Sequence, residues 1–408
     1  MEVLHPHCAG LDVHKDTVVA SVRIQEGPTA RRVVETFGTT TKALLALSDW
    51  LGEHGVTHVA MEATGVYWKP VWHVLEASFE LVLANAMHIK NVPGRKTDVN
   101  DATWIADLLA HGLIRSSFVP PTAIQEMRTL MRTRKQFVRE RAQHVQRIQK
   151  TLEDANVKIA SVVSDVVGTS GRAILKALID GESRPEKLLE VTTGRLRADR
   201  STLLEALRGC VRKHHRFMLQ LHLCQIEALE KSIETIDAEV GPTLEPFREK
   251  AARLMTMPGI SDVTAQVIVS EIGIDMSRFP TAGHLISWAG LCPRNDESAG
   301  KRRSTRLRQG APWLKATLTQ AAWSAARSKS GYLHAQFLRL KTRRGPKKAI
   351  MAVAASMLTA VYYMLRDDVD YRDLGTDYFD RTDRVKAARR LVKRLGALGY
   401  AVEIKEAA

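Results

Sequence analysis

The chain has 408 residues, which is enough for two or three domains with a sizeable core. Its content of 45% hydrophobic and 26% charged residues is ordinary for a globular protein. We find no apolar run as long as a membrane span and no signal peptide, so we expect a cytoplasmic protein with no membrane contact. Four scattered cysteines exclude a disulfide framework and a zinc site: Cys8, Cys210, Cys224 and Cys292.

The net charge of +15 is unevenly distributed along the chain. Residues 1–120 carry 10 Lys and Arg against 13 Asp and Glu, whereas residues 121–408 carry 50 against 32. From Lys301 to Arg366 there are 15 basic residues and no acid. Because ordinary surfaces mix both signs, this stretch predicts a polyanionic partner, and nucleic acid is the first candidate. The alternative is a basic face that only aids solubility.

Strand and helix signals alternate over residues 1–118 and predict an α/β domain. We expect, in chain order, strands at 7–13, 17–24 and 31–38, a helix at 39–55, a strand at 56–62, a helix at 65–78, a strand at 79–86 and a helix at 98–114. Three antiparallel strands followed by parallel βα units make a mixed sheet. In such a sheet the first and fourth strands can be parallel neighbours.

Residues 119–245 read as a long helical, coiled-coil-like region. Thr122 and Gln125 have the spacing of a capping box, and Gly241–Pro242 predicts the end of the region. Two apolar series step by threes and fours, the first at Val138, Ala142, Val145, Ile148, Leu152 and Ala155, the second at Ile226, Leu229, Ile233, Ile236 and Val240. Packing of the two helices within the chain and a dimerisation arm both explain these seams.

Residues 246–408 predict a mainly helical C-terminal domain. A helix that stops at Pro258, turns at Gly259 and restarts with Ser261 or Asp262 as its cap has the pattern of a helix–hairpin–helix, whose amides can meet a DNA phosphate. Further helices are expected at 312–328, 346–365 and 380–398, the first with Pro312 in its first turn.

Four carboxylates occupy positions that can converge. Asp12 ends the first strand, Glu62 ends the fourth, and Asp98 and Asp101 project from one face at the start of the helix after the last strand. Converging carboxylates repel one another unless a cation lies between them. Oxygen ligands alone suit Mg²⁺ or Mn²⁺, which support phosphodiester chemistry. Each acid also has a bland explanation as a capping or turn residue. Asp16 and Asp107 are acids nearby that we leave out of this group.

Several motifs resemble one known family. "GLDVHK", "MEATGVYW" and "KTDVNDA" resemble the N-terminal motifs of the DEDD insertion-sequence transposases, the IS110 family. "MPGISDVTAQVIVSEIG", the segment from "WAGLCPRNDESAGKRRSTRLRQGAP" onward, and "YRDLGTDYFDRTDR" resemble the C-terminal part of that family. The resemblance implies an N-terminal domain similar to RuvC and ribonuclease H. It also implies an acidic tetrad at Asp12, Glu62, Asp98 and Asp101.

The resemblance further implies a serine nucleophile, which falls on Ser298 in "NDESAGK". Many family members read Ser-Gly there, whereas this chain reads Ser-Ala-Gly, so Ser304 is a second candidate. A hydroxyl needs an activating base or metal to attack phosphorus. Nearby basic residues can hold a phosphate or contact nucleic acid: Lys301, Arg302, Arg303, Arg306 and Arg308.

The family's partners are implied in the same way. They are DNA at the element ends and target, a structured guide RNA that selects sequence by base pairing, and further copies of the chain in a dimer or tetramer. In such an oligomer the acidic domain of one subunit can complete the serine domain of another. We therefore expect an RNA-guided recombinase that moves its own insertion sequence. A metal-dependent junction nuclease using water and a non-catalytic nucleic-acid-binding scaffold are the alternatives.

Overall fold

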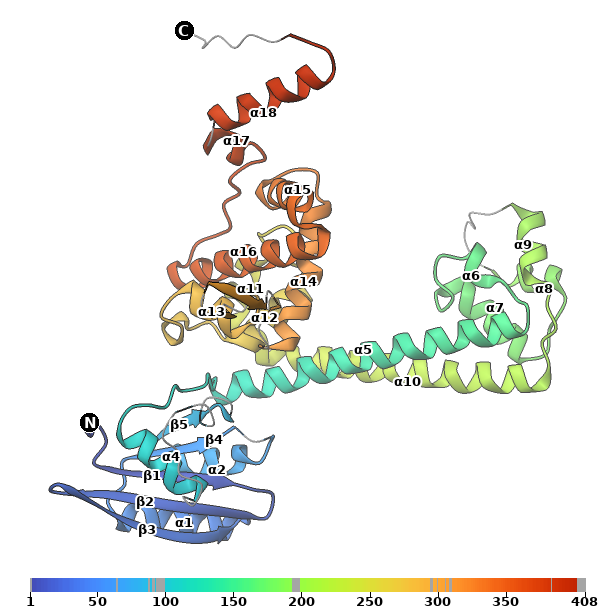
Figure 1. Cartoon of the computed structure of the whole chain (residues 1–408). Helices are drawn as coiled ribbons and strands as arrows, with labels where there is room; N and C mark the ends of the chain where they lie inside the picture. Colours follow the sequence, from blue (N-terminus) through green and yellow to red (C-terminus); the bar gives the residue numbers. More distant parts are fainter. Residues whose placement is uncertain are drawn as a thin grey trace. The chain divides into compact units, whose positions relative to one another are not determined.

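The computed structural model of the chain describes residues 2–63, 65–86, 89, 92, 100–192, 199–293, 296–298, 300–304, 306, 307, 310–382 and 384–401. The chain divides into two compact units, Met1–Val119 and Pro120–Ala408, and each is described by itself (Figure 1).

The N-terminal unit is built on a five-stranded mixed sheet with the strand order β3-β2-β1-β4-β5. Its elements are β1 (His7–Val13), β2 (Thr17–Glu26), β3 (Thr29–Gly38), α1 (Thr41–Glu53), β4 (His58–Glu62), α2 (Trp68–Leu75), β5 (Glu80–Ala84) and α4 (Asp101–Ala110). β1 pairs antiparallel with β2 and parallel with β4. The predicted order of strands and helices is confirmed, and so is the parallel pairing of the first and fourth strands.

Helix α1 covers one face of this sheet. Thr40 caps it by accepting a hydrogen bond from the Ala43 amide, and its inward leucines, Leu44, Leu47 and Leu51, recur every three to four residues. All three are buried in one cluster with strand residues such as Leu11. Full burial of each leucine contributes about 1.5–3 kcal/mol, so this face anchors the sheet. Helix α2 adds Val71 and Leu75 to the same cluster.

Helix α4 covers the opposite face and lies unusually close to β1. Ile105, Leu108 and Leu109 pack there with Cys8 and Ala60. At Gly10 the helix backbone approaches the strand directly. A Cβ added to Gly10 would lie 2.2 Å from the Ala102 carbonyl oxygen and 2.4 Å from the Ala106 nitrogen. Glycine is required here because no side chain fits between helix and strand, not because of its φ angle.

We expect Gly10→Ala to destabilise the N-terminal unit by about 1–3 kcal/mol, because the new methyl group overlaps the α4 backbone. Chemical denaturation of the full chain measures the loss. The matched control is Gly52→Ala near the end of α1, where a Cβ meets nothing within 4 Å. This control should be neutral or stabilising, since alanine favours the helix over glycine. Equal effects at the two positions would contradict the close contact.

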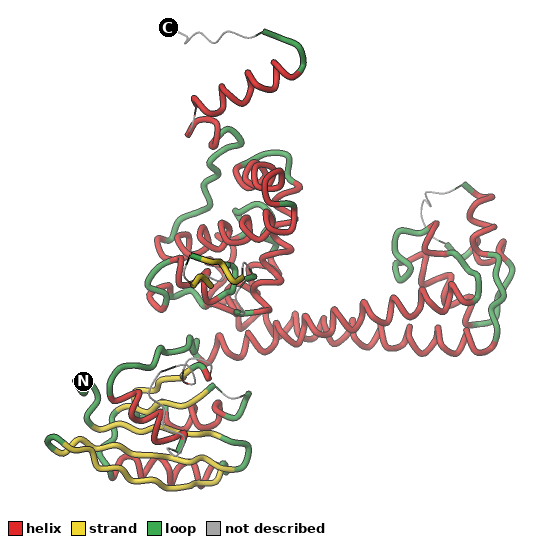
Figure 2. The backbone as a smooth tube through the Cα atoms, viewed as in Figure 1, coloured by secondary structure: helices red, strands yellow, loops and turns green. Residues whose placement is uncertain are grey.

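The C-terminal unit begins with two long helices, α5 (Thr122–Asp154) and α10 (Lys213–Leu244), which pack side by side as an antiparallel pair (Figure 2). The seam is buried at Ile148, Leu152 and Ile226, whereas Val138 remains 43% exposed. Packing within the chain is thus the observed role of the seams. The helices between them are α6 (Ile159–Val162), α7 (Thr169–Ile179), α8 (Pro185–Glu190) and α9 (Arg200–Leu207).

Two local predictions about the ends of these helices are wrong. Pro242 does not end α10 but lies inside it, two residues before its last residue, Leu244. Thr122 is not an N-cap, since α5 starts at Thr122 itself and Pro121 holds the cap position. The Gln125 side chain donates instead to the Pro120 carbonyl at 3.0 Å.

The remaining elements form a helical domain with one small hairpin. They are η1 (Glu245–Phe247), α11 (Arg248–Leu254), α12 (Asp262–Ile272), η2 (Met276–Arg278), α13 (Ala282–Trp288), β6 (Asp296–Ser298), β7 (Lys301–Ser304), α14 (Pro312–Arg327), α15 (Tyr332–Arg344), α16 (Pro346–Asp367), α17 (Tyr378–Thr382) and α18 (Arg384–Ala397). The expected helices at 312–328 and 346–365 are confirmed. The last expected helix corresponds to α17 and α18, whereas helix α15 and the hairpin have no counterpart among the predicted elements.

Helix α16 is the central helix of this domain. Within the described residues it alone is long and apolar enough to pass for a membrane span, contrary to our reading of the sequence. More than half of its apolar window, 56%, is buried inside the protein. It packs against α13, α14 and α15, so its apolar length serves the core of the domain.

A buried ion pair joins α5 to α12. Glu271 is 1% exposed and accepts two hydrogen bonds from the Arg132 guanidinium, at 2.7 and 2.8 Å. Arg128 donates to the Ser270 and Glu271 carbonyl oxygens at 3.1 and 2.7 Å, and burial lowers its pKa to about 10. The sequence signal for this contact was a lone acid in the apolar run "VIVSEIG".

Candidate active site

The register of two parallel strands aligns Asp12 with Glu62. Leu11 on β1 lies opposite Met61 on β4, so the next residue on each strand is one of the two acids. Successive side chains of a strand point to opposite faces. Asp12 therefore shares a face with Gly10, and Glu62 shares that face with Ala60. This is the face that α4 covers.

The direction of α4 brings Asp101 toward the same edge. The Cys8 thiol contacts the Ala106 carbonyl at 3.5 Å, whereas Gly10 lies against both Ala106 and Ala102. Later residues of β1 therefore lie beside earlier residues of α4. Asp12, two residues beyond Gly10, lies toward the first turn of α4. Asp101 is the first residue of that turn, and Asn100 caps it by accepting from the Ala102 amide at 2.9 Å.

The described acids are accessible. Asp12 has a side chain that is 25% exposed and lies 3.2 Å from His14 Nε2. Glu62 is half-buried and Asp101 is exposed. The fourth candidate, Asp98, lies outside the described residues. In the part of the chain that the structure describes, no three His, Cys, Asp or Glu side chains are grouped closely enough to hold a metal ion.

The donor chemistry of this edge nevertheless fits a hard divalent cation. The strand register and the course of α4 direct carboxylate oxygens to one end of β1 and β4, and carboxylates are the ligands that Mg²⁺ and Mn²⁺ prefer. The described residues there include no cysteine that would favour zinc.

Asp107, the acid that we left out, has a structural role. It accepts from buried Arg23 at 3.1 Å and from Arg32 at 3.0 and 3.1 Å. These contacts clamp α4 onto β2 and β3. A second clamp is the hydrogen bond from Thr103 to Ser21, at 3.1 Å. Asp16, the other omitted acid, lies exposed in the turn between β1 and β2.

We expect Asp107→Ala to destabilise the N-terminal unit by about 3 kcal/mol, because it leaves the buried Arg23 guanidinium without its carboxylate. Thermal or chemical unfolding of the full chain measures the change. Asp16→Ala is the control, since it removes an exposed acid and should change stability by less than about 0.5 kcal/mol. A stable Asp107→Ala variant would show that the ion pair does not hold α4.

Ser298 lies on a short hairpin in the C-terminal unit. It is the last residue of β6 and pairs with Lys301 on β7, so it lies in a strand directly beside the turn. Gly300 in that turn has a φ of +74°, which favours glycine. The side chains of Ser298, Arg302 and Arg303, and Arg308 as a whole, lie outside the described residues.

The structure describes the exposure and the contacts of other residues around this hairpin. Lys301 and Arg306 are exposed. The Ser304 hydroxyl accepts a hydrogen bond from the Arg306 amide at 3.2 Å, which is a local turn contact. Pro293 and Leu307 pair across the base of the hairpin. A Cβ on Gly310 would lie 2.4 Å from the Gly290 nitrogen, so the chain returns tightly against the end of α13.

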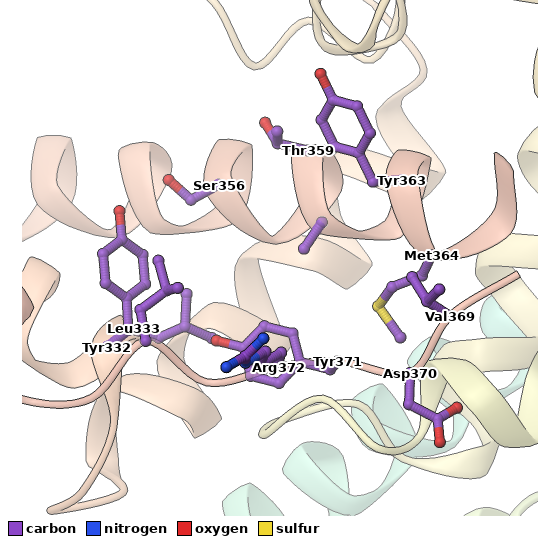
Figure 3. Close-up of a pocket in the computed structure, with 12 residues that line it drawn as sticks. Tyr332, Leu333, Ser356, Thr359, Tyr363, Met364, Val369, Asp370, Tyr371 and Arg372 are labelled. Atoms are coloured by element: carbon purple, nitrogen blue, oxygen red, sulfur yellow. The ribbon is translucent and has the colours of Figure 1, made fainter. Parts of the chain in front are cut away.

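The cavity in Figure 3 involves neither the candidate acids nor the Ser298 hairpin. It has a volume of about 380 Å³ and lies between α15, α16 and residues 369–374. Tyr332, Leu333, Tyr363 and Met364 give it a mainly apolar lining. None of the candidate residues lines it, so we assign it no role in catalysis.

Comparisons with known proteins agree with the motifs. Residues 9–157 match a family model for IS110 transposases of the DEDD type. Residues 251–338 match the model described as the transposase IS116/IS110/IS902 family. The two matches lie in order and together cover more than half of the chain.

Two relatives illustrate the similarity. The 43.6 kDa protein of insertion element IS110 from Streptomyces coelicolor is 29% identical over 153 residues, which is 36% of this chain and 36% of that protein. The 42 kDa protein of insertion element IS900 from Mycobacterium paratuberculosis is 24% identical over 330 residues, which is 72% of this chain and 81% of that protein. With both family models matched in order, the chain belongs to the IS110 family of insertion-element transposases.

Proposed function

We propose that the chain cleaves and exchanges DNA strands to move its own insertion sequence, with the carboxylates and Ser298 as its reactive groups. The observation that carries this proposal is the register of β1 and β4, which aligns Asp12 with Glu62 under the helix that starts with Asp101. Transposase families bind DNA, and DEDD transposases in general use divalent metal ions.

The N-terminal unit supports an RNase H/RuvC-like assignment. Its sheet has three antiparallel strands followed by two parallel ones, with helices on both faces. In this proposal residues 1–118 are the acidic domain, residues 119–245 are the helical arm and residues 246–408 are the serine domain.

Asp12, Glu62, Asp98 and Asp101 would hold one or two Mg²⁺ or Mn²⁺ ions, which when bound polarise a phosphate and stabilise a leaving oxygen. Asn100 supports this edge by capping α4, so Asp101 is held at the start of a formed helix. Arg23 and Arg32 hold the far end of α4 through Asp107.

Ser298 would attack the DNA backbone. Its hydroxyl proton passes to solvent, a bond forms between Oγ and phosphorus, and a strand P–O bond breaks to release a hydroxyl end. Attack by a hydroxyl of another strand on the phosphoserine then joins the strands and restores the serine. Ser304 is the weaker candidate, because its hydroxyl already accepts from the Arg306 amide.

Helices α11 and α12 would contact a DNA phosphate as a helix–hairpin–helix. Ser261 caps α12 by accepting from the Thr264 amide, and Ser261 and Asp262 are both exposed. Gly259, with a φ of +87°, allows the turn to pack directly on α14. Because the turn packs on α14 through Gly259, the start of α12 remains open to solvent, where helix amides can bind an anion.

Lys301, Arg302, Arg303, Arg306 and Arg308 would hold nucleic acid near Ser298. The structured guide RNA and the assembly into a dimer or tetramer belong to the same proposal. They are supported by the resemblance to the family and by the basic excess of residues 121–408. Where base pairing with a guide RNA selects the sequence, the protein itself binds mainly the phosphates and recognises the shape of the nucleic acid.

We expect Asp12→Asn to abolish strand cleavage while the chain remains folded. The change removes a charged ligand but leaves a side chain of nearly the same shape, and it relieves repulsion among the acids. Gel analysis of labelled element-end DNA in Mg²⁺ measures cleavage, and circular dichroism checks the fold. Asp16→Asn, in the exposed turn nearby, is the control and should cleave normally. Cleavage at the wild-type rate by Asp12→Asn would remove this acid from the site.

We expect Ser298→Ala to lose both strand cleavage and the covalent protein–DNA adduct while it still binds nucleic acid. The substitution deletes the attacking oxygen and little volume. Denaturing electrophoresis of labelled DNA after reaction detects the adduct. Ser304→Ala is the matched control, three residues from the pairing partner of Ser298 on the same hairpin, and it should retain the adduct.

The alternatives give different results in the same assay. Full cleavage by Ser298→Ala with no adduct in any variant would favour the metal-dependent nuclease that uses water. Loss of the adduct in Ser304→Ala instead would move the nucleophile. DNA binding without metal-dependent cleavage in the wild type would favour the non-catalytic scaffold.

A further inference from the structure

Three cations of α5 lie on one face where the helix passes the start of α14. Arg132, Lys135 and Arg139 are spaced by three and four residues, which places them on neighbouring turns of the same side. The Lys135 ammonium donates to the Thr317 hydroxyl at 2.7 Å and to the Trp313 carbonyl at 3.4 Å. This contact joins the middle of α5 to the first two turns of α14.

The acid Glu271 balances only part of the charge of this face. Glu271 pairs with Arg132, but no ion pair among the described residues joins a carboxylate to Lys135 or Arg139. Burial and the neighbouring Arg139 lower the pKa of Lys135, and Glu271 offsets only part of that effect. Holding like charges this close costs stability unless an anion reduces the repulsion. The unbalanced cations are therefore better suited to binding than to folding.

The Trp313 ring contacts the Arg139 guanidinium through a cation–π interaction, which does not use the hydrogen-bond donors of Arg139. The guanidinium carbon lies 5.0 Å from the centroid of the indole ring, over its face, and Arg132 lies 5.9 Å from the same ring. Such a cation–π contact fixes the plane of the guanidinium and leaves its N–H groups directed outward. Arg139 is exposed, so these donors are accessible. A planar fork of donors matches the oxygens of a phosphate.

Only a few residues of sequence separate this face from the Ser298 hairpin. Leu307 pairs with Pro293 at the base of the hairpin, and α14 begins at Pro312. Trp313 is thus six residues beyond the hairpin base. Gly310 packs against Gly290 within this connection, so little slack remains between the hairpin and Trp313.

We propose that Lys135, Arg139 and Trp313 form a binding site for one backbone phosphate of the DNA duplex that Ser298 cleaves. Arg139 and Lys135 contact the phosphate, and Trp313 is a positioning residue that orients Arg139. The proposal rests on the proposed function, because it assigns the site to DNA from its connection with the Ser298 hairpin. It concerns α5 and α14, and it is distinct from the basic residues 301–308.

The test measures binding of the full chain to a labelled DNA duplex and to a labelled RNA hairpin over a range of salt concentrations. Arg139→Ala should weaken duplex binding about tenfold, as for loss of a charged hydrogen bond. It should also make the plot of log affinity against log salt shallower by about one, because one fewer counterion is released. RNA binding should not change. Lys150→Ala is the matched control, an exposed cation further along α5, and it should leave duplex binding within about twofold.

Trp313 is tested through its coupling to Arg139. Trp313→Leu should weaken duplex binding, and the double variant with Arg139→Ala should bind no more weakly than Arg139→Ala alone. A purely structural tryptophan would add its own loss. If Arg139→Ala does not fold, as judged by thermal unfolding, Arg139→Gln replaces it, because it keeps the stem and removes the charge.

Several results would overturn the site. Unchanged duplex affinity and salt slope in Arg139→Ala would do so, as would an equal loss in Lys150→Ala. A loss of RNA binding instead of duplex binding would assign the face to RNA.

The adduct assay on the wild type separates this proposal from the proposed function. A wild-type adduct with normal duplex binding by Arg139→Ala rejects only the site, whereas weakened duplex binding by Arg139→Ala without any wild-type adduct rejects the serine chemistry.

Discussion

The N-terminal unit depends on the direct contact between the backbone of α4 and the β1 strand at Gly10. With no side chain between them, the helix lies flat on the sheet and its first turn approaches the end of β1. Rotation of the helix is limited by two contacts to β2 on the same side, the Thr103–Ser21 hydrogen bond and the Asp107 pair with Arg23. A bulkier residue at position 10 would lift the whole helix, and Asp101 with it, away from Asp12 and Glu62.

In the C-terminal unit the comparable constraint is the end of α12. Arg128 donates to two carbonyls in the last turn of this helix, where the helix dipole favours a cation, and Arg132 pairs with the buried Glu271 side chain. A buried ion pair adds little net stability compared with apolar packing, but breaking it leaves a costly unpaired charge. Its effect is to set which turn of α5 meets the helical domain. That register also decides that Lys135 and Arg139 face α14.

The two units divide the charges that strand transfer needs. Asp12, Glu62 and Asp101 belong to the N-terminal unit, and the acid-free stretch from Ser298 to Arg366 belongs to the C-terminal unit. In the proposed function, a polyanionic backbone would be repelled by these carboxylates and attracted by the basic stretch, unless a bound metal ion reversed the local charge.

The sequence by itself determined the order of strands and helices in the N-terminal unit, because caps, breaks and apolar spacing act over a few residues. It also placed Asp12 and Glu62 at the ends of strands that topology allows to be neighbours. Local signals gave the wrong position at Pro242 and Thr122, because such signals place a helix end only to within a few residues. Only the tertiary structure decided that β1 and β4 pair in the register that aligns the two acids, that Arg23 and Arg32 bind Asp107, and that Glu271 receives Arg132. It likewise placed Lys135 against Thr317, a contact between residues 182 positions apart. No local pattern encodes such pairs, because they form only when separately specified elements pack together.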